Sequence, residues 1–131
     1  MTNFYKRLEK LRAQMGTHNL DCLYITKITN VKYMTGFTGS AGQFILTDKD
    51  AIFLTDSRYT EQSQKQVKNA QVHIIEKGYV PLIKKLNVFK SGMNVGFESI
   101  HTSVKLYNEI NKEFEKIKFI PTEELVENLA A

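Results

Sequence analysis

The sequence contains very little of several residue types that would change how its fold is interpreted. It has one cysteine, two prolines and no tryptophan among 131 residues. A single cysteine excludes an internal disulfide and favours an intracellular protein. The two prolines and seven glycines leave no room for a disordered linker. We therefore expect a folded chain that owes its stability to packing.

Long apolar runs are also missing. No stretch approaches the ~20 apolar residues that a bilayer-spanning helix needs. Residues 1–15 carry charges throughout, a pattern that argues against a signal peptide. We expect a cytoplasmic protein with no membrane partner.

The length and charge indicate one globular domain over residues 1–131. Hydrophobic residues make up 42% and charged residues 24% of the chain, which are ordinary globular values. The net charge is +4, but the 18 Lys and Arg residues are scattered along the sequence, and no basic stripe or nucleic-acid motif is present. We therefore expect no nucleic-acid partner.

Helical and strand patterns alternate along the chain. Phe4, Leu8, Leu11 and Met15 recur at the spacing of one helix face, which predicts a first amphipathic helix ending near Gly16. Further helices are predicted at residues 30–34, 56–68, 82–89, 102–116 and 122–131, and strands at 21–26, 44–46, 51–54, 71–76, 94–97 and 118–120. The alternation predicts an α/β fold, a mixed sheet with helices on both faces and one β-hairpin.

Glycines at positions 36, 39 and 42 form the pattern GxxGxxG in a predicted loop. Glycine permits positive φ and close approach to the backbone, so we expect a ligand or other residues of the chain to contact the main chain of this loop. A phosphate loop is disfavoured, because a strand follows where a helix N-terminus would be needed. A tight turn and a ligand-facing loop remain open. Phe37, Thr38 and Ser40 favour the ligand-facing loop, although Phe37 also suits a core position.

The segment Asp56-Ser57-Arg58-Tyr59 opens the helix predicted after the hairpin. Asp56 suits a helix cap, Arg58 a pair with Glu61 at i+3, and Tyr59 a core aromatic. The planar fork of Arg58 would also suit a carboxylate on a substrate, a neighbouring domain or a partner.

No catalytic residue and no metal ligand can be identified. The three histidines lie in different predicted elements, without a partner at metal-ligand spacing. Cys22 lies in an apolar strand pattern and suits the core. Ser40 lacks a nucleophile elbow and an obvious base.

Three motifs resemble a known family when they are taken in order. They are NVKYMTGFTGSAG at residues 30–42, LTDSRY at residues 54–59 and VGFE at residues 95–98. The chain resembles, over essentially its whole length, the N-terminal domain of Xaa-Pro peptidases, the aminopeptidase P and prolidase group that includes creatinase. The resemblance implies a creatinase/prolidase N-terminal fold with a ribonuclease H-like motif.

The resemblance also implies a function for a longer protein. In that family a larger catalytic domain of the pita-bread fold follows, and it holds two divalent metal ions, usually manganese, that activate a water for attack on the amide before proline. That domain is absent from this chain, whose last residues form a helical pattern without a capping glycine, as expected of a fragment. The chain alone is expected to be inactive.

Site roles follow from the same resemblance, position by position. The loop residues Phe37, Thr38, Gly39 and Ser40 would line the substrate cleft for proline-containing peptides. Asp56, Arg58 and Tyr59 would support that loop or meet a neighbouring subunit, because the resemblance implies a homodimer. The domain would thus contribute oligomer contacts and a cleft wall while the chemistry takes place elsewhere.

Two other functions stay open. Related domains occur in proteins without peptidase chemistry, so a stand-alone peptide- or protein-binding module of the same fold is the main alternative. An independent nucleotide-binding α/β domain is the second. The coding sequence after Ala131 separates the enzyme from the binding module, because only the enzyme needs a downstream set of Asp, His and Glu ligands.

Overall fold

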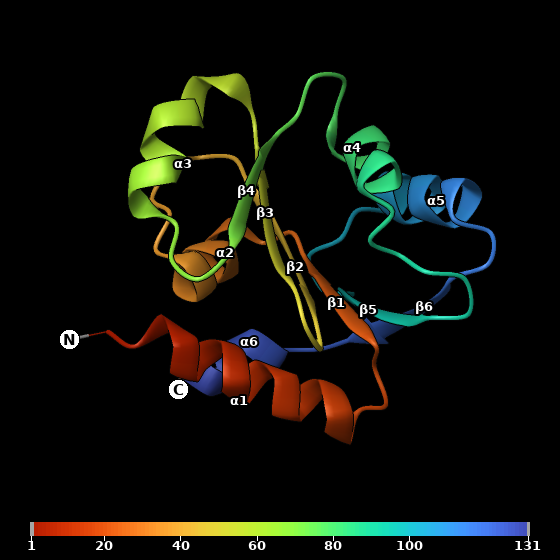
Figure 1. Cartoon of the computed structure of the whole chain (residues 1–131). Coiled ribbons are helices and arrows are strands. Elements are labelled where there is room, and N and C mark those ends of the chain that lie inside the picture. Colours follow the sequence, from red (N-terminus) through yellow and green to blue (C-terminus); the bar gives the residue numbers. More distant parts are fainter. Residues whose placement is uncertain (1, 131) are drawn as a thin grey trace.

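Short apolar segments with alternating side-chain directions build a six-stranded mixed sheet between two layers of helices (Figure 1). The computed structural model describes residues 2–130. The helices are α1 (Phe4–Thr17), α2 (Ile28–Thr35), α3 (Thr60–Gln66), α4 (Tyr79–Leu86), α5 (Val104–Glu113) and α6 (Leu125–Ala130), with a short 3₁₀ helix, η1 (Ser57–Tyr59), before α3. The strands are β1 (Cys22–Ile25), β2 (Gln43–Thr47), β3 (Ala51–Thr55), β4 (Gln71–Ile74), β5 (Asn94–Glu98) and β6 (Lys118–Thr122).

The strands lie in the order β4-β3-β2-β1-β5-β6, and β2 alone runs against the others. The β2–β3 hairpin closes with a bond from the Thr47 amide to the Asp50 carbonyl oxygen at 2.9 Å. The predictions of a mixed sheet and of a hairpin at this place are confirmed.

Each inner strand is apolar on both sides, because helices cover both faces of the sheet. In β1, Leu23 and Ile25 pack into the core beneath α1, α2 and α6, whereas Cys22 and Tyr24 pack toward α4 and α5. Figure 1 shows these two helix layers on opposite sides of the strands. Cys22 has no exposed surface, which confirms the prediction that it lies in the core, and this burial raises the pKa of its thiol.

The predicted bounds of α4, β6 and α6 were wrong, and local backbone geometry explains the differences. Helix α4 starts at Tyr79 and stops at Asn87, whose φ of 54° is left-handed, so Pro81 is its third residue. Proline is tolerated there because the first turn needs no intrahelical N–H donor. Strand β6 continues through Pro121 to Thr122, because an edge strand accepts proline, and α6 therefore begins only at Leu125.

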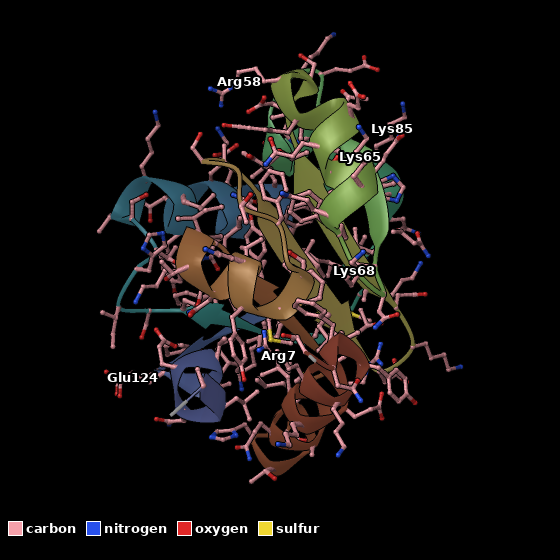
Figure 2. All side chains as sticks on the ribbon, turned by 90° about the vertical axis from the view of Figure 1, so that its left-hand side faces the viewer. Arg7, Arg58, Lys65, Lys68, Lys85 and Glu124 are labelled. Carbon is pink, nitrogen blue, oxygen red and sulfur yellow. The ribbon has the colours of Figure 1, made fainter. Side chains whose placement is uncertain are left out.

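Arginines of α1 fasten this helix to the rest of the domain. The Arg7 guanidinium donates to the Tyr33 carbonyl oxygen at 2.6 Å and lies 3.8 Å from the centre of the Tyr33 ring. Arg12 donates through Nε to the Thr47 carbonyl oxygen at 2.9 Å. Figure 2 shows Arg7 where α1 meets α2, whereas Arg58 lies at the periphery. Two of the three arginines thus serve internal contacts.

Glu98, at the end of β5, joins three segments. Its carboxylate accepts the backbone N–H groups of Thr26 and Lys27, both at 2.8 Å, and the side-chain amide of Asn30 at 2.6 Å. The start of α2 has no capping side chain of its own, so Glu98 supplies the acceptor from 71 residues away. Two motif residues distant in sequence, Asn30 and Glu98, therefore meet for a structural reason.

Replacing Glu98 tests this joint. Glu98→Ala leaves two backbone donors and one amide without their acceptor and should lower the free energy of unfolding by about 2 kcal/mol. Glu98→Gln retains an oxygen acceptor and should cost less. Urea unfolding midpoints of the two variants would measure the difference, provided that the dependence of unfolding free energy on urea concentration (the m value) is the same in both. Equal midpoints for Glu98→Ala and the unmodified chain would contradict the capping role.

Candidate functional site

The glycine loop, residues 36–42, connects α2 to β2. Gly36 ends α2 in a left-handed conformation with φ of 84°, which glycine adopts without strain. Buried threonines fix the two ends of the loop. Thr35 Oγ accepts the Phe37 amide at 3.2 Å, and Thr55 Oγ donates to the Ala41 carbonyl oxygen at 2.7 Å. The path of the loop is therefore set by bonds to the sheet and to α2.

The Phe37 side chain is fully buried, at 0% exposure. Its ring centre lies 4.8 Å from that of Phe53 and 5.3 Å from that of Tyr59, the latter in an edge-on arrangement. The expectation that this ring lines a substrate cleft is wrong, because the ring has no exposed surface in this domain. Phe37 anchors the glycine loop from within the core.

The glycines of the loop make room for these rings. A Cβ on Gly39 would lie 2.2 Å from Phe37 Cζ and 2.9 Å from Tyr59 Cε1. A Cβ on Gly42 would lie 2.9 Å from Phe53 Cε1. Close approach to the backbone is therefore real, as the GxxGxxG pattern predicts. The groups that approach are the domain's own aromatic side chains.

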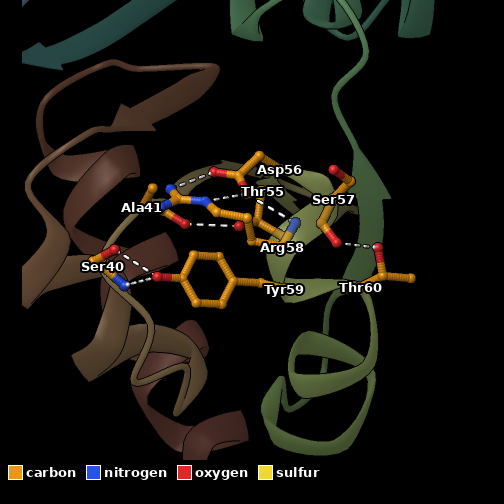
Figure 3. A network of polar contacts seen from close by, with 8 residues as sticks. All are labelled: Ser40, Ala41, Thr55, Asp56, Ser57, Arg58, Tyr59 and Thr60. Carbon is orange, nitrogen blue, oxygen red and sulfur yellow. Dashed lines mark hydrogen bonds and ion pairs between the residues drawn. The ribbon is translucent and has the colours of Figure 1, made fainter.

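Thr38 and Ser40 are the exposed side chains of the loop, on either side of half-buried Gly39. The Tyr59 hydroxyl accepts the Ser40 amide at 3.2 Å and lies 2.5 Å from Ser40 Oγ (Figure 3). These hydrogen bonds from Ser40 lower the pKa of Tyr59, because they favour the phenolate form. Tyr59 thus packs on Phe37 with its ring and holds Ser40 with its oxygen.

Asp56 and Arg58 form a pair beside this contact (Figure 3). Asp56 Oδ1 caps the short helix η1 by accepting the Arg58 amide at 3.0 Å, which confirms the predicted cap. The Arg58 guanidinium donates to both carboxylate oxygens of Asp56, from Nε to Oδ1 at 2.9 Å and from Nη2 to Oδ2 at 2.8 Å. These bonds lower the pKa of Asp56 and raise that of Arg58.

The predicted pair of Arg58 with Glu61 is wrong. Glu61 pairs instead with Lys65 at 3.1 Å, because i and i+4 positions face each other on α3. Arg58 starts in η1, outside the regular helix, and reaches back to Asp56. Its side chain remains 65% exposed, so the outer edge of the guanidinium faces solvent.

Two glutamines of α3, which the sequence analysis did not single out, bind the loop at Thr38. Gln66 Oε1 accepts the Thr38 amide at 2.9 Å, and Gln62 donates to Thr38 Oγ at 3.2 Å. The signal in the sequence was their i and i+4 spacing, which places two amides on one helix face. A shallow groove of ≈ 530 Å³ runs along this face, lined by Arg58, Glu61, Gln62, Lys65 and Gln66.

Within residues 2–130, no three His, Cys, Asp or Glu side chains are grouped so that they could hold a metal ion. None of the described helices is both long and apolar enough to cross a bilayer. Thr38 and Ser40 present exposed hydroxyl groups, which can donate and accept hydrogen bonds.

Gly39→Ala tests the packing of the loop on its aromatic anchor. The added methyl group collides with the Phe37 ring, so the variant should lose about 1–3 kcal/mol of unfolding free energy. Gly16→Ala in α1 is the matched control, because nothing lies within 4 Å of its Cβ position. The control should be stabilised by about 0.5 kcal/mol through helix propensity. Thermal or urea unfolding measures both, and an unchanged Gly39→Ala would contradict the close packing.

Known proteins are similar to this chain in sequence and in structure. A family model described as the Creatinase/Prolidase N-terminal domain matches residues 7–129. A peptidase of Bacillus subtilis (strain 168) called YqhT, described as uncharacterized, is 39% identical over 125 residues, which cover 94% of this chain and 35% of that protein. Human Xaa-Pro aminopeptidase 2 is 34% identical over 119 residues, covering 79% of this chain and 17% of the relative.

Solved structures agree with these matches. The N-terminal domain of the cytoplasmic peptidase PepQ from Mycobacterium tuberculosis H37Rv superposes with a TM-score of 0.85 at 29% identity, covering 95% of this chain and 98% of that one. An Xaa-Pro dipeptidase from Bacillus anthracis gives a TM-score of 0.82 at 30% identity, with 97% of this chain and 36% of that chain covered. The chain spans about a third of the length of YqhT, at 35%, and of the Bacillus anthracis dipeptidase, at 36%. It belongs to the creatinase/prolidase N-terminal domain family.

Proposed function

We propose that this chain is the N-terminal domain of a metal-dependent Xaa-Pro aminopeptidase or dipeptidase, in which it lines the substrate cleft and contributes subunit contacts. The observation that carries the proposal is the family membership over residues 7–129, together with relatives roughly three times as long. Two relatives, human Xaa-Pro aminopeptidase 2 and the Xaa-Pro dipeptidase from Bacillus anthracis, are named for cleavage of Xaa-Pro peptides. In this proposal the chain itself is catalytically silent.

The catalytic part of the parent is a separate domain that follows this one and holds two divalent metal ions, with manganese as the proposed metal. When bound, such ions activate a water for attack on an amide carbon. The donor set in residues 2–130 does not fit this role, because no three ligating side chains are grouped there. No step of the chemistry is therefore assigned to these residues.

The cleft-lining surface is proposed to be the outer part of the glycine loop, namely exposed Thr38, half-buried Gly39 and exposed Ser40. Phe37 acts beneath it as the anchor, because its ring is enclosed in the core. A wall of this kind favours short peptides by excluding longer ones, without taking part in bond breaking. Such a wall can exclude longer peptides only if it keeps a fixed position. The hydrogen bonds of Thr35, Thr55 and Tyr59 hold the loop in place.

Asp56, Arg58 and Tyr59 have two proposed tasks. Tyr59 supports the wall directly through Ser40. Asp56 orients the Arg58 guanidinium while its outer edge stays open to solvent, and that edge suits a carboxylate of a neighbouring subunit or of the catalytic domain.

The proposed partners are the parent's own catalytic domain, proline-containing peptides and a second subunit in a homodimer. A cytoplasmic location is proposed as well, since one structural relative is described as a cytoplasmic peptidase. A binding module of the same fold without peptidase activity remains the second candidate, because Thr38 and Ser40 would also serve recognition alone.

The first test concerns activity. The purified chain, supplied with manganese and an Xaa-Pro dipeptide or tripeptide, should release no proline and no N-terminal amino acid. The parent protein that includes the downstream domain should release them under the same conditions, and chelation should abolish that release. Turnover by the chain alone would overturn the assignment of chemistry to another domain. A parent without turnover would favour the binding module.

The second test adds bulk to the wall. In the parent protein, Ser40→Tyr should reduce kcat/KM for peptides longer than a dipeptide by about tenfold relative to a dipeptide, because the larger side chain narrows the cleft. Asp48→Tyr is the control, since exposed Asp48 lies in the hairpin turn at the other end of β2. A change in kcat/KM that is equal for all peptide lengths, or equal in both variants, would contradict the wall.

A further inference from the structure

The position of Thr38 is set by side chains of α3. Gln66 uses both ends of its amide on this one residue: Oε1 accepts the Thr38 N–H at 2.9 Å, and Nε2 donates to Thr38 Oγ at 2.9 Å. Gln62 Nε2 donates to Thr38 Oγ at 3.2 Å and to Gln66 Oε1 at 3.1 Å. The three side chains therefore form a closed hydrogen-bonded set.

We propose that Gln62 and Gln66 are positioning residues, which hold the glycine loop so that Thr38 and Ser40 face the substrate cleft. The inference rests on the proposed function of this loop and identifies the residues that make it a fixed wall. It differs from the expectation that Arg58 supports the loop, because the Arg58 guanidinium bonds to Asp56.

The flanking glycines explain why Thr38 needs side chains to hold its position. Thr38 lies between Gly36 and Gly39, and each glycine gives the backbone more conformational freedom than other residues do. The ring of Phe37 fixes the inner side of this segment, but the Thr38 side chain is exposed and is not held by burial in the core. Two amide side chains that bind both its backbone N–H and its hydroxyl replace that missing restraint.

Helix α3, which carries both glutamines, is itself attached to the rest of the domain at two places. Ser63, on the inner side of the helix, is fully buried at 0% exposure. Just after the helix, the Lys68 amide donates to the Thr35 carbonyl oxygen at 2.9 Å, next to the start of the loop. The helix and the loop are thus joined both at Thr35 and at Thr38, so movement of one is resisted by the other.

The chain offers a matched control within the same helix. Gln64 has the same side chain, but it is exposed, whereas Gln62 and Gln66 are half-buried. Two residues of helix rotate a side chain by about 200°, which places Gln64 on the other face. Substituting Gln64 therefore keeps the composition and helix propensity of the change while leaving Thr38 untouched.

The first experiment uses the chain itself and measures amide hydrogen exchange by NMR. Gln66→Met removes the hydrogen bonds at nearly constant volume and should speed exchange of the Thr38 amide about three- to tenfold. Gln64→Met should leave it unchanged. Gln66→Glu, which retains an acceptor for the Thr38 N–H, should restore part of the protection. Equal exchange in Gln66→Met and the unmodified chain would overturn the proposal.

The second experiment measures function in the parent protein. Gln66→Met should lower the preference for dipeptides over longer peptides by several-fold, through KM for the longer peptides, while kcat for the dipeptide stays unchanged. A merely structural role would instead lower the amount of active enzyme and reduce kcat for all peptides alike. That outcome would overturn the positioning role.

These two experiments, read together with the Ser40→Tyr test of the cleft wall, separate this inference from the proposed function. If Thr38 exchange accelerates and Ser40→Tyr changes the length preference but Gln66→Met does not, the glutamines are not positioning residues for the cleft. If Ser40→Tyr has no effect on length preference, the proposed wall itself fails, whatever Gln66→Met does to exchange.

Discussion

The burial of the Phe37 ring is the interaction on which the candidate site depends. The ring occupies the core between Phe53 and Tyr59, and the loop must fold over it closely enough that Gly39 has no room for a side chain. With the apolar member of the loop turned inward, the backbone carries Thr38 and Ser40 outward. The same packing brings the Tyr59 hydroxyl to Ser40. One buried ring thus sets both the shape of the loop and the polarity of its surface.

The loop is held by side chains from four elements, and this distribution explains how a glycine-rich segment is restrained to one path. Thr35 of α2, Thr55 of β3, Tyr59 of η1 and the glutamines of α3 each bind a different part of it. Individual hydrogen bonds of this kind contribute only about 1 kcal/mol each. Their joint effect is geometric, because they define one conformation among the many that glycine allows. A cleft wall requires such a defined conformation more than it requires reactive groups.

The fold was largely predictable, because burial on both faces leaves a strong apolar pattern in the inner strands. The hairpin, the mixed sheet and the buried role of Cys22 all follow from local apolar runs and turn residues. Element ends were less predictable, since Asn87 stops α4 through its left-handed backbone and Pro121 is accepted in an edge strand. Helix starts also depend on distant groups. The Glu98 carboxylate caps the start of α2 across 71 residues, and no window of local sequence contains that information.

The candidate site was predictable as a segment but not in its side-chain roles. From the sequence alone came the family resemblance, the tight glycine loop and the Asp56 cap, because these rest on local spacing and backbone preference. Only the tertiary structure decided that Phe37 faces inward, that Arg58 pairs with Asp56 and that Gln62 and Gln66 hold Thr38. The physical reason is that a side chain's direction and partners depend on which surfaces the completed sheet and helices bring together, and those surfaces come from residues far apart in the chain.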